Sequence, residues 1–88
     1  MTYAFQKSTR KNKKYMVNYD HKWIHFGDTR YDQYEDKTPL QLYKGQNHYD
    51  IKRRDAYRKR AKGIKDKNGN LSYLDKASPN YYSVKYLW

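Results

Sequence analysis

Apolar and polar side chains alternate along residues 15–26, YMVNYDHKWIHF, and this alternation predicts a β-hairpin. Asp20 and His21 are expected to form its turn, although they lack the Asn-Gly pair that marks the tightest hairpins. Gly27 and Asp28 follow the second strand and end it. In the first strand, one face is expected to hold Tyr15, Val17 and Tyr19. In the second strand, Trp23 and His25 are expected on one face, and Ile24 and Phe26 on the other.

Residues 47–64, NHYDIKRRDAYRKRAKGI, have the spacing of one long helix. Asn47 is the expected N-cap, and Gly63 is the expected C-terminal stop. One narrow face is apolar and is expected to dock on a small core, with Arg53 and Arg60 at its borders. That face comprises Tyr49, Ala56, Tyr57, Ala61 and Ile64, and the opposite face projects Lys52, Arg58, Lys59 and Lys62.

Shorter segments surround these two elements. Thr38 and Pro39 form a cap followed by proline, so residues 39–44 are expected to be a short helix. Asn68-Gly69 predicts a turn. The final segment, PNYYSVKYLW, follows the cap Ser78 and is expected to be a short helix or an extended tail. Its aromatic side chains are expected to dock on the domain or on a neighbouring protein.

The first fourteen residues contain Lys and Arg but no acidic residue. We expect residues 1–14 to form a basic extended arm that docks on phosphate or on another subunit, with a solubilising tail as the alternative. Residues 15–88 then form one small α+β domain. Its expected architecture is a β-hairpin packed on one long basic helix plus short helices, followed by an aromatic C-terminal tail.

Composition narrows this picture. The chain has 88 residues and a formal charge of +11 at pH 7, which attracts nucleic acid, anionic membranes or acidic proteins. Aliphatic residues are scarce, so twelve Tyr, two Trp and two Phe must supply most of a thin core. Cysteine is absent, which excludes disulfides and cysteine-based zinc sites. No apolar run approaches the length of about 20 residues that crosses a bilayer, so we expect no membrane partner and no signal peptide.

The acidic and histidine residues are the candidates for catalytic or metal chemistry. Asp28, Asp32, Glu35 and Asp36 form one acidic stretch between two basic blocks, and internal ion pairing with the basic helix is the favoured interpretation over a metal site. A metal or nuclease role for His25 and His48 lacks any supporting second motif, so we expect both to be hydrogen-bonded in the fold. The sequence therefore predicts no catalytic residue, no metal, no cofactor and no small-molecule substrate.

Basic residues interleaved with aromatic residues carry the stronger signal. Lys and Arg neutralise phosphates, and Tyr and Trp stack on unpaired bases. The same residue types are enriched at the hot spots of protein interfaces. The candidates for binding nucleic acid or a partner are Lys11, Lys13, Lys14, Lys52, Arg53, Arg54, Arg58, Lys59, Arg60 and Lys62. The candidate interface aromatics are Trp23, Tyr81, Tyr82, Tyr86 and Trp88.

A combination of short motifs resembles a family of small basic proteins encoded by large DNA viruses and some tailed phages. The motifs are His25-Phe26-Gly27, then Tyr31, Tyr34 and Asp36, then His48, Asp50, Arg53, Arg54, Tyr57 and Arg60, and finally Leu87-Trp88. The resemblance spans residues 13–88, with two departures. Residues 38–46 look like an insertion, and Ala61 stands where members of the family often have a second His. The resemblance implies a viral origin and no particular activity.

Three functional hypotheses follow. The first is a viral structural protein, located in the virion and in the host cytoplasm during assembly, which packs against larger capsid or virion proteins and contacts DNA or RNA through its cationic surface. The second is a free accessory protein that binds nucleic acid without sequence preference. The third, ranked below both, is a His-dependent nuclease.

Overall fold

The predicted hairpin is present, and its strands are longer than the sequence indicated. In the computed structural model, which describes residues 4–88, strand β2 spans Lys13–Tyr19 and strand β3 spans Lys22–Asp28. Tyr19 pairs with Lys22 across a two-residue turn. Asp20 and His21 have φ angles of 52° and 63°, so both central residues are left-handed, as a type I′ hairpin turn requires.

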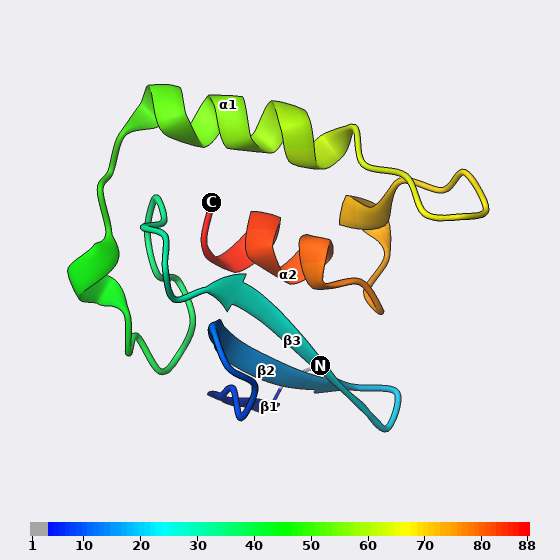
Figure 1. Ribbon diagram of the computed structural model, residues 1–88, viewed down its shortest axis with the longest axis horizontal. Helices are drawn as coiled ribbons and strands as arrows, with labels where there is room; N and C mark the ends of the chain where they lie inside the picture. Colours follow the sequence, from blue (N-terminus) through cyan, green and yellow to red (C-terminus); the bar gives the residue numbers. More distant parts are fainter. Residues whose placement is uncertain (1–3) are drawn as a thin grey trace.

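A third strand extends this hairpin into a sheet. Strand β1, Ala4–Lys7, pairs antiparallel with β2, which gives the strand order β1-β2-β3 (Figure 1). The expected basic arm is therefore not confirmed over its described part, and its residues 1–3 lie outside the described residues. Residues 4–7 belong to the sheet, and Lys13 and Lys14 begin β2. Phe5 explains the difference, because its ring packs edge-on against Phe26 and Tyr86 and anchors the strand.

The helix that covers the sheet is the C-terminal one. Helix α2, Pro79–Tyr86, lies between the sheet and helix α1, Ile51–Lys62, and α1 contacts α2 rather than any strand (Figure 1). The expected packing of the hairpin on the long basic helix is therefore wrong. The physical reason is that Ala61 is the only buried residue of α1, whereas α2 buries Tyr82 and Ser83.

An aromatic core joins α2 to the sheet. The buried cluster consists of Tyr15, Val17, Ile24, Phe26, Tyr82 and Leu87. The rings of Phe26 and Tyr82 lie 5.7 Å apart, and those of Tyr15 and Phe26 lie 5.8 Å apart. The Tyr82 hydroxyl donates to the Lys76 carbonyl at 2.6 Å, which satisfies its polar end. The predicted Tyr-lined core is confirmed.

Between β3 and α1 the chain forms a long loop, and the short helix expected over residues 39–44 is absent. Within it, only the 3-10 turn η1, Lys44–Gln46, is helical. The Asp36 side chain organises this loop, because it accepts hydrogen bonds from Thr38 N, Thr38 Oγ1 and Tyr43 N at 3.0, 2.6 and 3.1 Å, and from the Tyr15 hydroxyl. The Asn47 side chain also serves the loop, since its Oδ1 accepts from Gln33 Nε2 and Asp36 N.

The ends of the helices follow capping chemistry, with one correction. Asp50, not Asn47, is the N-cap of α1, and its carboxylate accepts from Lys52 N and Arg53 N. Gly63 ends α1 as predicted. The 3-10 turn η2, Ser72–Leu74, and the Asn80 side chain then connect the two helices, because Asn80 Nδ2 donates to Ala61 O at 2.8 Å.

Two further predictions at chain reversals are confirmed. Asn68-Gly69 forms a turn in which Gly69 has a φ of +83° and Asp66 Oδ1 accepts from Asn68 N at 2.8 Å. Ser78 caps α2 by accepting from Asn80 N, and Pro79 is the first helical residue.

Candidate functional site

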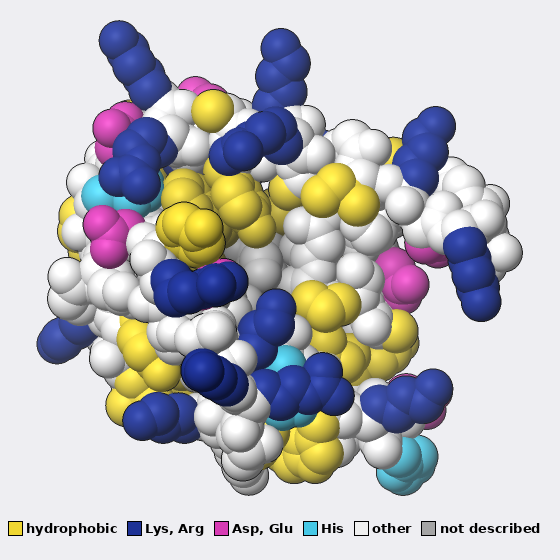
Figure 2. All heavy atoms as spheres, viewed as in Figure 1, with side chains coloured by type: hydrophobic (Ala, Val, Ile, Leu, Met, Phe, Trp, Pro, Cys, Tyr) yellow, Lys and Arg dark blue, Asp and Glu magenta, His cyan; other side chains and the backbone are white. Residues whose placement is uncertain are grey.

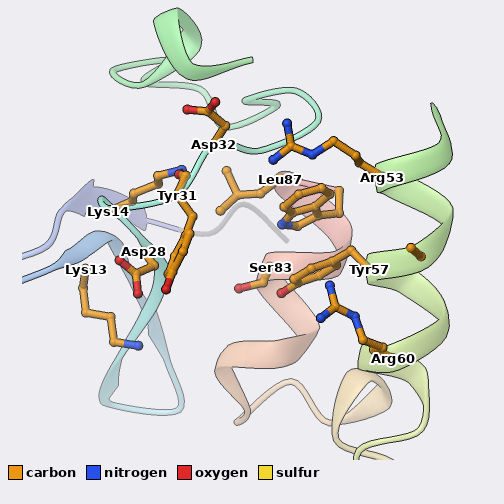
Figure 3. A pocket seen from close by; sticks show the side chains of 13 residues that line it. Lys13, Lys14, Asp28, Tyr31, Asp32, Arg53, Tyr57, Arg60, Ser83 and Leu87 are labelled. Carbon is orange, nitrogen blue, oxygen red and sulfur yellow. The ribbon is translucent and has the colours of Figure 1, made fainter. Parts of the chain in front are cut away.

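A cleft of about 620 Å³ opens between the sheet and the two helices. One wall comes from β2, from the end of β3 and from the turn that follows β3, and the other comes from α1 and the C-terminal end of the chain (Figure 3). In the space-filling view, a hollow beneath α1 is bordered by hydrophobic side chains and by Lys and Arg side chains (Figure 2). The lining residues are Lys13, Lys14, Gly27, Asp28, Tyr31, Asp32, Arg53, Ala56, Tyr57, Arg60, Ser83, Leu87 and Trp88.

On the sheet side, a buried lysine fixes the wall. Lys14 is 1% exposed, and its ammonium donates to the Tyr31 carbonyl at 2.8 Å and to Gln33 Oε1. Burial lowers the pKa of Lys14 to about 8, and the nearby carboxylates of Asp32 and Asp36 oppose this shift. Lys14 therefore holds the loop in place and leaves Tyr31 exposed at the edge of the cleft.

Gly27 is required at the base of this wall. Its φ is +78°, and a Cβ atom there would lie 2.9 Å from Leu87 Cδ1 and 3.0 Å from Lys14 Cβ. The absence of a side chain lets the C-terminal residues approach β3 closely.

The helical wall carries two arginines and a stacked aromatic pair. Arg53, Tyr57 and Arg60 recur at the spacing of one helix face and line the cleft together. The Tyr57 and Trp88 rings stack in parallel, with centroids 4.2 Å apart and an interplanar angle of 10°. Burial raises the pKa of Tyr57, and a hydrogen bond with Ser83 opposes the shift.

The lining of the cleft has more positive than negative charges, because Lys13, Lys14, Arg53 and Arg60 outnumber Asp28 and Asp32. Lys13, Arg53 and Arg60 are exposed. Asp28 is held by Arg30 through two side-chain hydrogen bonds of 3.0 and 2.8 Å, which lower the pKa of Asp28 to about 2. Its negative charge is therefore offset locally by a cation outside the lining.

The expected ion pairs between the acidic stretch and the basic helix are not found among residues 4–88. The two salt bridges there join Arg30 to Asp28 and Arg54 to Asp55. Asp36 serves the loop instead, as a hydrogen-bond acceptor.

The structure divides the predicted cationic residues into three groups. Lys13, Arg53 and Arg60 are exposed cations that meet in the cleft. Lys14 also lines it, but its predicted role as a binding cation is wrong, because it is buried and its ammonium is bound to the loop. Arg54 and Arg58 serve the fold, because the Arg54 guanidinium lies 4.8 Å from the centre of the Tyr34 ring and Arg58 Nη2 donates to the Trp88 carbonyl at 2.6 Å. The remaining residues are exposed outside the cleft: Lys11, Lys52, Lys59 and Lys62.

The predicted interface aromatics are also divided. Tyr82 is fully buried in the core, so it is not accessible to a partner. Tyr81 and Tyr86 are partly buried against that core, and Trp88 lines the cleft. Trp23 remains 42% exposed. The expected docking face of α1 is mostly wrong, because Tyr49, Ala56 and Ile64 are exposed and only Tyr57 and Ala61 are partly or fully buried.

Tyr31 and Ser83 line the same site as Arg53, and no pattern in the sequence indicates this directly. Tyr31 stands out only as part of the acidic stretch and of the family pattern. No local signal exists for the cleft itself, because β2, β3, α1 and α2, which come from distant parts of the chain, build it together.

The histidines are placed in separate hydrogen-bond arrangements. His25 Nδ1 lies 2.7 Å from Ser8 Oγ, and His48 Nδ1 accepts from Asp50 N at 2.9 Å. Burial is the main cause that lowers the pKa of both rings. Across residues 4–88, no three His, Asp or Glu side chains come together as metal ligands would. None of the described helices has the length and apolar character needed to span a membrane.

Comparison with known proteins gives one match. A model of a family of unknown function, DUF5754, matches residues 3–42, which is slightly less than half of the chain. No curated protein and no solved structure matches. The matched region contains the sheet-side wall of the cleft and none of α1. The sheet and the first part of the loop that follows it are therefore similar to an uncharacterised family.

Proposed function

We propose that this protein is a small structural component of a virus particle, without a catalytic role, which contacts the phosphate backbone of nucleic acid and packs against larger virion proteins. The virion setting rests on the resemblance of its residue pattern to small viral proteins. In this setting the protein is made in the host cytoplasm and is retained in the assembled particle.

The observation that carries the nucleic-acid contact is the convergence of exposed cations on one cleft. Lys13 comes from the sheet, and Arg53 and Arg60 come from α1. Arginine guanidinium groups match the geometry of phosphate oxygens, and desolvated surroundings strengthen such contacts. The total charge of +11 adds a long-range attraction that does not depend on base sequence.

Exposed apolar residues support the contact with larger proteins. Trp23, Leu42 and Ile51 are 42%, 54% and 56% exposed. Aromatic and aliphatic residues of this kind are buried at the centre of protein interfaces. A fixed copy number in purified particles would support the virion proposal, whereas loss of the protein during particle purification would favour the free accessory protein.

Paired charge removals on one helix test the backbone contact. Arg53→Ala with Arg60→Ala removes two cations from the cleft, and Lys59→Ala with Lys62→Ala removes two exposed cations outside it. The cleft pair should lower DNA affinity by about tenfold for each phosphate that is no longer neutralised at 0.1 M salt. The outer pair should have a much smaller effect. An equal loss of affinity in both double variants would contradict the cleft as the binding site.

A further inference from the structure

The shape of the cleft suggests which form of nucleic acid it accepts. Its volume of about 620 Å³ is in the range of sites that enclose a single small organic group. A duplex presents phosphates on a convex surface and keeps its bases stacked inside, so it would reach only the cations at the rim. A single strand can place an unpaired base inside.

Aromatic side chains line both walls. Tyr31 lies on the sheet side and Tyr57 on the α1 side, with the cleft between them (Figure 3). The Tyr31 side chain is 66% exposed, so its ring is accessible to an incoming group. The stacked Tyr57 and Trp88 rings form a rigid surface opposite, and Leu87 adds aliphatic surface. Stacking on aromatic rings tolerates every base, because each base has a π face.

The cations are placed where a sugar-phosphate backbone would follow such a base. Lys13 is at the sheet side, and Arg53 and Arg60 are two turns apart along α1, on either side of Tyr57 (Figure 3). Neither arginine is in the salt bridges found among residues 4–88. These two positions can contact successive phosphates while the aromatic residues between them contact the base.

We propose that the cleft binds an unpaired nucleotide of single-stranded nucleic acid, with its base against Tyr31 and the Tyr57–Trp88 pair and its phosphates at Lys13, Arg53 and Arg60. This inference rests on the proposed contact with nucleic acid and makes it specific for strand form. The protein then prefers single strands to duplexes, because only a single strand uses the aromatic walls as well as the cations.

The test compares a single-stranded thymidine oligonucleotide, its uridine RNA equivalent and a duplex of the same length by fluorescence anisotropy. Tyr31→Ala should weaken single-strand binding by about tenfold and leave duplex binding unchanged, whereas Tyr31→Phe should retain it. Tyr49→Ala is the matched control, because Tyr49 is similarly exposed at 58% but lies outside the cleft. Comparing the affinities for the DNA and the RNA oligonucleotide shows whether the protein also distinguishes deoxyribose from ribose.

The outcomes separate the two proposals. Equal single-strand and duplex affinities in the unchanged protein, or equal losses for both in Tyr31→Ala, would overturn the single-strand inference while the backbone contact stands. Failure to bind either form at low salt would overturn both. As a second readout, Trp23→Phe leaves Trp88 as the one tryptophan, and its fluorescence should be quenched by the single strand if the base stacks in the cleft.

Discussion

Replacing Asp36 with alanine should destabilise the protein more than any change at its exposed charges. Asp36 is 2% exposed and accepts hydrogen bonds from Thr38 N, Thr38 Oγ1, Tyr43 N and the Tyr15 hydroxyl. The two hydroxyls can rotate to other acceptors, but the two backbone donors cannot. A buried donor without a partner costs about 1–3 kcal/mol, so Asp36→Ala should lower the free energy of unfolding by about 3–5 kcal/mol.

Urea denaturation followed by circular dichroism measures this loss. A domain of this length has a free energy of unfolding of about 5–10 kcal/mol, so the variant should unfold at a much lower urea concentration. Glu35→Ala removes the same charge at the neighbouring position and is the control, and it should change stability by about 0.5 kcal/mol or less. Asp36→Asn keeps one oxygen acceptor and should fall between the two. A loss below about 1 kcal/mol in Asp36→Ala would refute the role of Asp36 in organising the loop.

Two further predictions concern the walls of the cleft. Gly27→Ala should lower the free energy of unfolding by about 2 kcal/mol or more, because its φ of +78° disfavours a side chain and the new Cβ would crowd Leu87; an unchanged melting temperature would contradict the close approach. Burial lowers the pKa of Lys14 to about 8, so the unfolded chain keeps this proton at pH values where the folded chain has lost it. The stability of the unchanged protein relative to Lys14→Met should therefore rise between about pH 8 and pH 10. Urea titrations over this pH range measure the difference. If the free energies of unfolding of the two proteins change in parallel with pH, the lowered pKa of Lys14 is contradicted.

Local patterns in the sequence predicted the elements whose structure depends on neighbours in the chain. Alternation placed the hairpin at residues 15–26, and cap residues placed the start of α2 at Ser78 and Pro79. Asp20 and His21 form the predicted hairpin turn without its usual signature, and the short polar side chain of Asp20 tolerates the left-handed conformation.

The elements that the sequence predicts wrongly are those whose structure is determined by contacts between residues distant in the chain. Asn47 has the chemistry of an N-cap, but its side chain is engaged by Gln33 and by the backbone of Asp36. Residues 39–44 have a helical start signal, yet Asp36 and Tyr15 bind the backbone of Tyr43 and Leu42 in a loop. No local pattern reveals such partners, because they are brought together only by the folded chain.

The candidate site also combines features that local sequence predicts with features that depend on contacts between distant residues. The cationic character of Arg53 and Arg60 and their place beside Tyr57 could be predicted from helical spacing. Their meeting with Lys13 and Tyr31 could not, because it requires α2 to separate α1 from the sheet. The packing of α2 on the sheet therefore creates the cleft.

The proposed use of the positive charge of this protein is direct contact with nucleic-acid phosphates. Measuring the affinity of the purified protein for single-stranded and duplex DNA across a salt series tests it most directly. We predict a linear fall of log affinity with log salt and a slope of about −2 to −3, as expected if Lys13, Arg53 and Arg60 each neutralise one phosphate. Negligible binding at physiological salt would contradict this use of the charge and would assign the cations to an acidic protein partner.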